Sequence, residues 1–95
     1  HLPHLLAFSL VQLAAKPNRR KTLELAGSSF RDATRVAASS PEMWVDICLD
    51  NRKALLAALS DYEKLLNSLR RDIQGGGDKS LRRFFESAAK TRRKL

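Results

Sequence analysis

The segment of residues 5–15 carries almost no polar side chain, and this feature constrains the fold more than any other. Only Ser9 and Gln12 interrupt its apolar residues. A helix on the surface of a globular protein has one apolar stripe, whereas this segment would be apolar nearly all round. A chain of 95 residues has too few other helices to surround it. We therefore expect a partner chain to cover part of this helix, which should end before Pro17.

The remaining sequence also favours helices over strands. The apolar residues of segment 51–74 follow heptad spacing, which is typical of a helix packed in a bundle. Gly75, Gly76 and Gly77 then predict a helix end and a flexible turn. The sequence therefore predicts an all-α helical bundle in a single domain, residues 1–95. Its expected helices are 5–15, 20–26, 30–38, one that starts at Pro41 with Ser40 as N-cap, 51–74, and a last one with Asp78 as N-cap.

The net charge and the cysteine content restrict the partners and the cellular compartment expected for this protein. The net charge is +8, which suggests an anionic partner such as nucleic acid, a membrane surface or an acidic metabolite. However, the basic residues are dispersed over several helices, and those at 90–94 are interpreted as a solvated chain end. The single cysteine, Cys48, excludes an internal disulfide and fits a reducing cytoplasm. Because the basic residues are dispersed, we expect no nucleic-acid partner. Residues 5–15 are too few for a membrane span, so we expect no membrane partner either.

One short stretch has the composition of an anion-binding site. Arg31, Asp32 and Arg35 fall on about one helical turn, directly after Gly27-Ser28-Ser29. They form either a surface ion-pair cluster or an arginine that Asp32 holds toward a carboxylate. Trp44 is expected in the core.

Two histidines near the start of the chain are the other candidates. His1 and His4 could be half-buried residues at a helix start or contacts to an anion. A metal site is disfavoured, since no third ligand lies nearby in the sequence.

Three sequence blocks together resemble one enzyme family. They are His-Leu-Pro-His-Leu-Leu-Ala from His1, Phe-Arg-Asp-Ala-Thr-Arg-Val-Ala-Ala-Ser from Phe30, and Pro-Glu-Met-Trp from Pro41 with the following Asp-Ile-Cys-Leu-Asp-Asn-Arg. In sequence and spacing they resemble the C-terminal domain of prephenate dehydrogenases and their arogenate-using relatives, from His1 to about residue 93. Gly27-Ser28-Ser29 departs from the three glycines that many members carry.

The resemblance implies a part of a two-domain enzyme. Members oxidise and decarboxylate prephenate to 4-hydroxyphenylpyruvate in tyrosine biosynthesis, with NAD or NADP bound mainly by an N-terminal Rossmann domain. The helical domain forms a homodimer and completes the substrate pocket. By motif match, Arg35 would bind a substrate carboxylate, His4 would contact substrate or inhibitory tyrosine, and Asp32 would hold Arg35. His1, Arg31 and Trp44 are weaker candidates.

The residues themselves agree with part of this implication. No Gly-x-Gly-x-x-Gly occurs in the sequence, so we expect no dinucleotide site, no catalytic residue and no activity in this fragment alone. The absence of an initiator methionine suggests a piece of a longer protein. Besides a prephenate or arogenate dehydrogenase domain, a purely structural helical dimerisation module remains an alternative.

Overall fold

The chain is all-α, as the sequence predicts. A computed structural model describes residues 1–24 and 27–95, except for the side chains of Arg20 and Thr22, and all regular elements in this part are helices. None of the described helices is long and apolar enough to cross a lipid bilayer. The chain divides into two compact units, His1–Ala58 and Leu59–Leu95, which are described separately.

Helix α1 (Leu2–Ala14) runs through the first unit. It begins earlier than predicted because Pro3 lies in its first turn, where a helix tolerates proline. Ala7 and Ala14 are buried, but Leu10 is 42% exposed and Leu13 is 44% exposed. The single chain therefore leaves part of this apolar helix uncovered.

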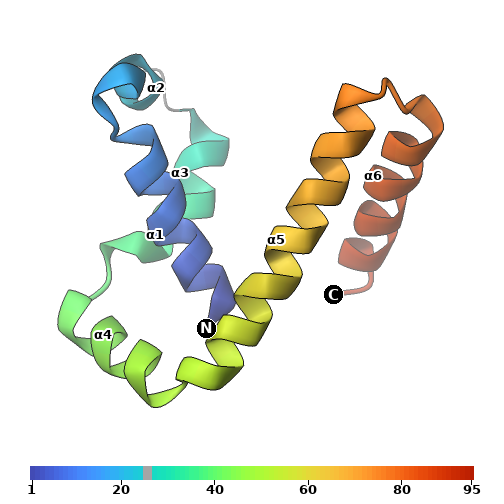
Figure 1. Ribbon diagram of the computed structural model, residues 1–95. Coiled ribbons are helices and arrows are strands. Elements are labelled where there is room, and N and C mark those ends of the chain that lie inside the picture. The colour runs from blue at the N-terminus through green and yellow to red at the C-terminus, as the bar shows by residue number, and fades with distance from the viewer. Residues whose placement is uncertain (25–26) are drawn as a thin grey trace. The chain divides into compact units, whose positions relative to one another are not determined.

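Four short elements follow α1, and three of them pack against it (Figure 1). The prediction of one helix over 30–38 was wrong, because the backbone changes from α to 3-10 geometry at Arg35. At this junction the Thr34 hydroxyl donates a hydrogen bond to the Phe30 carbonyl at 2.7 Å, a local bond that tends to bend a helix. The elements are η1 (Pro17–Arg19), α2 (Arg20–Glu24), α3 (Ser28–Thr34) and η2 (Arg35–Ala38), of which α2, α3 and η2 contact α1. Of the predicted helix 20–26, residues 25 and 26 lie outside the described part.

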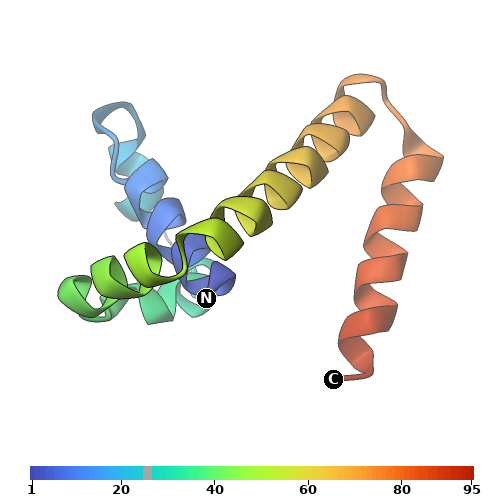
Figure 2. The ribbon, with the colours of Figure 1, turned by 60° about the horizontal axis from the view of Figure 1, so that its bottom comes forward.

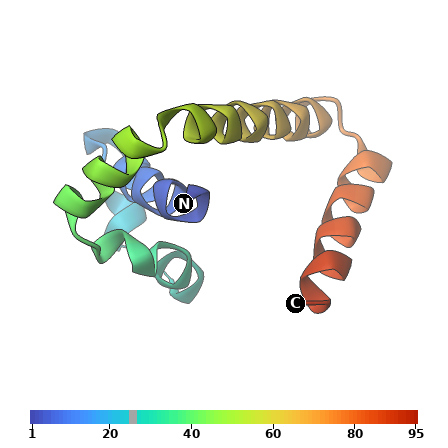
Figure 3. The ribbon, with the colours of Figure 1, turned by 90° about the horizontal axis from the view of Figure 1, so that it is seen from below.

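Helix α4 (Pro41–Asp50) starts as predicted. The Ser40 hydroxyl accepts a hydrogen bond from the Met43 N–H at 3.3 Å, and Pro41 occupies the first turn. The helix places Trp44, which is buried, against α1. Figure 3 shows α4 and the α3–η2 segment on different sides of α1.

Helix α5 (Arg52–Gln74) is continuous, and Leu55 near its start is buried in the first unit (Figure 2). Gly76, with φ of 63°, ends the glycine turn before α6 (Asp78–Arg93). The prediction of Asp78 as N-cap was wrong by one residue. Gly77 is the N-cap because its carbonyl accepts the first helical bond, from Leu81 N–H at 2.9 Å. In the second unit, Leu59–Leu95, every side chain is exposed or half-buried.

Candidate functional site

Trp44 lies at the centre of an aromatic cluster built by α1 and α4. The imidazole of His4 stacks on its indole, with ring centroids 4.4 Å apart and an interplanar angle of 23°. His1 and Phe8 meet the indole edge-on, at 5.8 and 6.2 Å. His1, His4 and Phe8 follow one another at spacings of three and four, which places them on one face of α1. The structure therefore brings three of the predicted site residues together: His1, His4 and Trp44.

The indole nitrogen of Trp44 has no hydrogen-bond partner. Trp44 is 8% exposed, and its Nε1 is the one buried side-chain nitrogen or oxygen without a partner among the described residues. An indole N–H can only donate, and leaving such a group unpaired in the interior costs about 1–3 kcal/mol. Because protein atoms cover this N–H, the groups of the cluster that a ligand can reach are the imidazoles of His1, which is exposed, and His4, which is half-buried.

Arg35 lies on a different side of α1 from α4 and Trp44 (Figure 3), and none of the described aromatic contacts joins it to the cluster. It is the first residue of η2, and η2 packs against α1, the helix that carries His1 and His4. Its side chain is exposed, so its guanidinium is open to a ligand. A guanidinium matches a carboxylate by two parallel hydrogen bonds, which an ammonium group cannot do.

The expected ion pair between Asp32 and Arg35 is not formed. Among the side chains that the structure describes, the one ion pair joins Arg82 to Asp78, at 3.5 Å. The helix changes geometry between Asp32 and Arg35, and both side chains are exposed, where such a pair gains less than about 1 kcal/mol. Arg31 is also exposed. A supporting role for Asp32 or Arg31 in ligand binding stays a prediction.

Phe8 is the residue of this site that the sequence did not single out. Its spacing from His4 is a signal that could have been used, since it lies one turn further on the same face. In the described ranges, 1–24 and 27–95, no three His, Cys, Asp or Glu side chains lie close enough to hold a metal ion.

Comparison with known proteins relates this chain to one protein family. The family model of the prephenate dehydrogenase dimerization domain matches residues 1–87. A cyclohexadienyl dehydrogenase of Zymomonas mobilis is 43% identical, over 92% of this chain and 31% of its own length. Prephenate dehydrogenases of Bacillus subtilis and Lactococcus lactis are 33% and 30% identical, over 93% and 100% of this chain. The chain spans 24–31% of the length of these three curated relatives.

Proposed function

The chain belongs to the prephenate dehydrogenase dimerization-domain family, and from this premise we propose that residues 1–95 form the C-terminal helical domain of an NAD(P)-dependent prephenate dehydrogenase. The parent enzyme oxidises and decarboxylates prephenate to 4-hydroxyphenylpyruvate for tyrosine biosynthesis in the cytoplasm. The names of the three relatives support this reaction class. An arogenate dehydrogenase is the alternative, since arogenate differs only in its side-chain amino group.

The substrate contacts proposed for this domain are Arg35 and His4. Prephenate is a dianion that carries two carboxylates, and the guanidinium of Arg35 supplies the charge and geometry to bind one of them. His4 is fixed by its stack on Trp44, so its imidazole is held in one orientation before substrate binds. The observation that carries this proposal is the stack of the half-buried His4 on Trp44, within a chain that matches this family over residues 1–87. Tyrosine, which also carries a carboxylate, is proposed as an inhibitor at the same residues.

The dinucleotide belongs to another part of the parent enzyme. The described part of this chain contains no strand, and the sequence contains no glycine fingerprint for a pyrophosphate, so these residues do not fit a Rossmann site. When bound elsewhere, NAD or NADP accepts the hydride. The work of this domain is to bind and orient the substrate, and we expect the chain alone to be inactive.

The binding test uses Trp44, the only tryptophan of the chain, as its reporter. Prephenate or tyrosine is titrated into the 95-residue chain, and the change in Trp44 emission is recorded for wild type, Arg35→Ala, His4→Ala and the control Arg19→Ala. Arg35→Ala should lose about 2–4 kcal/mol of binding, His4→Ala less, and Arg19→Ala nothing measurable. In the full-length parent, Arg35→Ala should mainly raise KM, because Arg35 positions the substrate. Circular dichroism checks that each variant folds.

A structural dimerisation module is the second candidate, and the match to a dimerization domain favours it as well. It predicts a stable homodimer whose Trp44 emission responds to neither prephenate nor tyrosine. If Arg35→Ala keeps wild-type affinity, Arg35 has no carboxylate role. If wild type fails to respond in both the fragment and the full-length enzyme, substrate binding by this domain is wrong.

A further inference from the structure

An apolar groove with an acidic border lies along α4. The groove has a volume of about 400 Å³ and lies between α1 and α4, with Trp44 in its wall. On α4 the groove residues Pro41, Val45 and Leu49 recur every four positions, so they form one stripe of the helix. Leu49 is 57% exposed although the groove around it is apolar. This groove is open to an apolar side chain from outside the first unit.

The acidic border follows from the sequence of α4. Each residue of this stripe, Pro41, Val45 and Leu49, is followed directly by an acid, which gives a second stripe of Glu42, Asp46 and Asp50 beside the first. All three carboxylates are exposed, and α4 contains no basic residue. None of them takes part in an ion pair among the described side chains. A partner that fills this groove should therefore pair an apolar group with cations.

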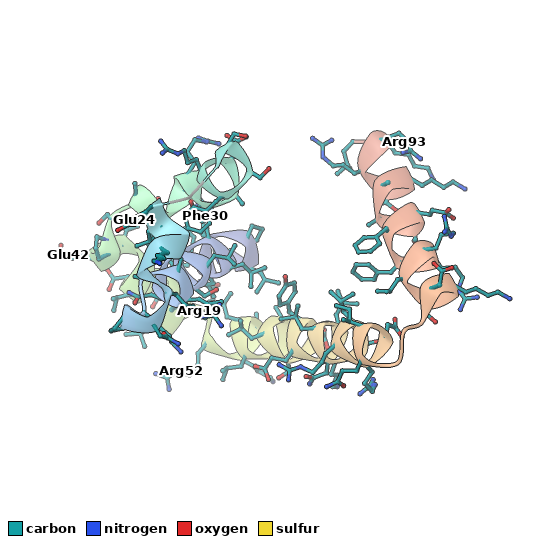
Figure 4. All side chains as sticks on the ribbon, turned by 90° about the horizontal axis from the view of Figure 1, so that it is seen from above. Arg19, Glu24, Phe30, Glu42, Arg52 and Arg93 are labelled. Carbon is teal, nitrogen blue, oxygen red and sulfur yellow. The ribbon has the colours of Figure 1, made fainter. Side chains whose placement is uncertain are left out.

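Helix α6 carries this combination on one face. Phe85 is 59% exposed, and Arg82 precedes it by three positions. Ala89 and Arg92 follow at spacings of four and three, so the four residues share one side of the helix. Residues 78–95 contain seven basic and two acidic side chains. In Figure 4, Glu42 on α4 and Arg93 on α6 both point away from the helix that carries them.

We propose that Phe85 and the arginines beside it, on α6 of one copy, dock into the α1–α4 groove of a second copy, with the arginines against the acidic stripe. This inference rests on the homodimer proposed above and names its contact surface. The lengths match, since Arg82 to Arg92 spans about 15 Å of helix and Glu42 to Asp50 about 12 Å. Phenylalanine and arginine are also enriched in protein interfaces. Each copy inserts its α6 into the groove of the other copy, so this contact occurs twice in a symmetric dimer.

A crosslinking experiment tests the contact directly. Cys48→Ser removes the native thiol, and Leu49→Cys or Phe85→Cys then adds one thiol to each of two differently tagged chains. On mild oxidation of the mixture, the heterologous Leu49→Cys with Phe85→Cys product should exceed either homologous product at least tenfold. Gln12→Cys in place of Leu49→Cys is the exposed control and should crosslink only at background level. Predominant crosslinking between two Leu49→Cys chains overturns the proposal, because the two grooves would then face each other.

A charge exchange supplies the second test. One variant carries Glu42→Lys, Asp46→Lys and Asp50→Lys, and the other carries Arg82→Glu, Arg92→Glu and Arg93→Glu. Each alone should dimerise about 100-fold more weakly at low salt, because like charges then meet at both contacts. An equimolar mixture should recover the wild-type dimer constant, since both contacts of the mixed dimer are again complementary. Lys16→Glu with Arg19→Glu and Lys21→Glu makes the same number of charge reversals as the arginine variant, at exposed positions outside α4 and α6, and controls for net charge.

The outcomes separate this inference from the proposed homodimer. If wild type sediments as a monomer at micromolar concentration, the homodimer itself is wrong and the inference falls with it. If wild type is a dimer, but both triple variants dimerise as well as wild type, only the α4–α6 contact is overturned. A chain with both Leu49→Cys and Phe85→Cys that closes only within itself overturns it too, because α6 would then occupy the groove of its own chain.

Discussion

The two units of this chain differ in what holds them together. Among the described side chains, the four buried ones, Ala7, Ala14, Trp44 and Leu55, belong to His1–Ala58, where they come from α1, α4 and the start of α5. Leu59–Leu95 is poorer in apolar side chains, and none of those it has is buried. Two helices joined by a turn cannot cover each other on more than one side. The first unit thus has a small core of its own, and the second unit has no buried side chain.

Large apolar side chains are exposed in both units, including Leu49 and Leu56 in the first. In the second unit Leu65, Leu66, Ile73 and Phe85 are between 46% and 61% exposed. An apolar patch of this kind on a soluble protein usually marks an interface. Exposed apolar side chains in the second unit therefore mark it as a candidate contact surface, beside the exposed apolar residues of α1 and α4 in the first unit.

We expect the largest loss of folding and dimerisation from a substitution in α1, at the surface that a partner chain is expected to cover. Leu10→Asp should abolish the dimer and the folded chain, because it places an unpaired charge in a contact that becomes buried on association. Gln12→Asp, which adds the same charge at an exposed polar position of α1, is the control and should fold normally. Sedimentation and circular dichroism provide the measurements. If Leu10→Asp remains a folded dimer, Leu10 faces water in the assembly and the first helix does not need a partner there.

The stability of the two units can be compared directly by replacing one leucine in each. Leu55→Ala should cost about 2–5 kcal/mol in the free energy of unfolding, because this residue is buried within the single chain. Leu66→Ala should cost a similar amount only at concentrations that favour the dimer. Urea denaturation of both variants at a low and a high protein concentration distinguishes the two costs. Equal costs at high dilution would mean that the second unit has a core of its own.

The smallest effect concerns one helix end. Ser40→Ala should lower the free energy of unfolding by about 1 kcal/mol, since it removes the acceptor for the Met43 N–H and frays the turn that carries Trp44. Ser60→Ala, at an exposed position of α5 whose hydroxyl makes no described hydrogen bond, is the control. Thermal melting followed by circular dichroism measures both variants. A melting curve of Ser40→Ala equal to that of Ser60→Ala would show that the cap does not stabilise α4.

Local signals in the sequence predicted much of the fold. The cap at Ser40, the heptad spacing of α5 and the glycines that follow it identify helices whose ends depend on nearby residues. The break at Arg35 was missed, because a change from α to 3-10 geometry depends on how the segment packs against α1. For the same reason the sequence pointed to His4 and Trp44 separately, while their stacking depends on the packing of α1 on α4.

The glycine turn between α5 and α6 gives the chain a site of attack by proteases. Gly75 and Gly76 are exposed, and the left-handed backbone of Gly76 strains any other residue. Exposed glycine turns are favoured cleavage sites, and a cut here would release α6 as a peptide of fewer than 20 residues. Such a short helix is marginal in water by itself. After such a cut, the rate at which the α6 peptide dissociates from the rest of the protein would therefore measure its non-covalent contacts alone, because the covalent link is gone.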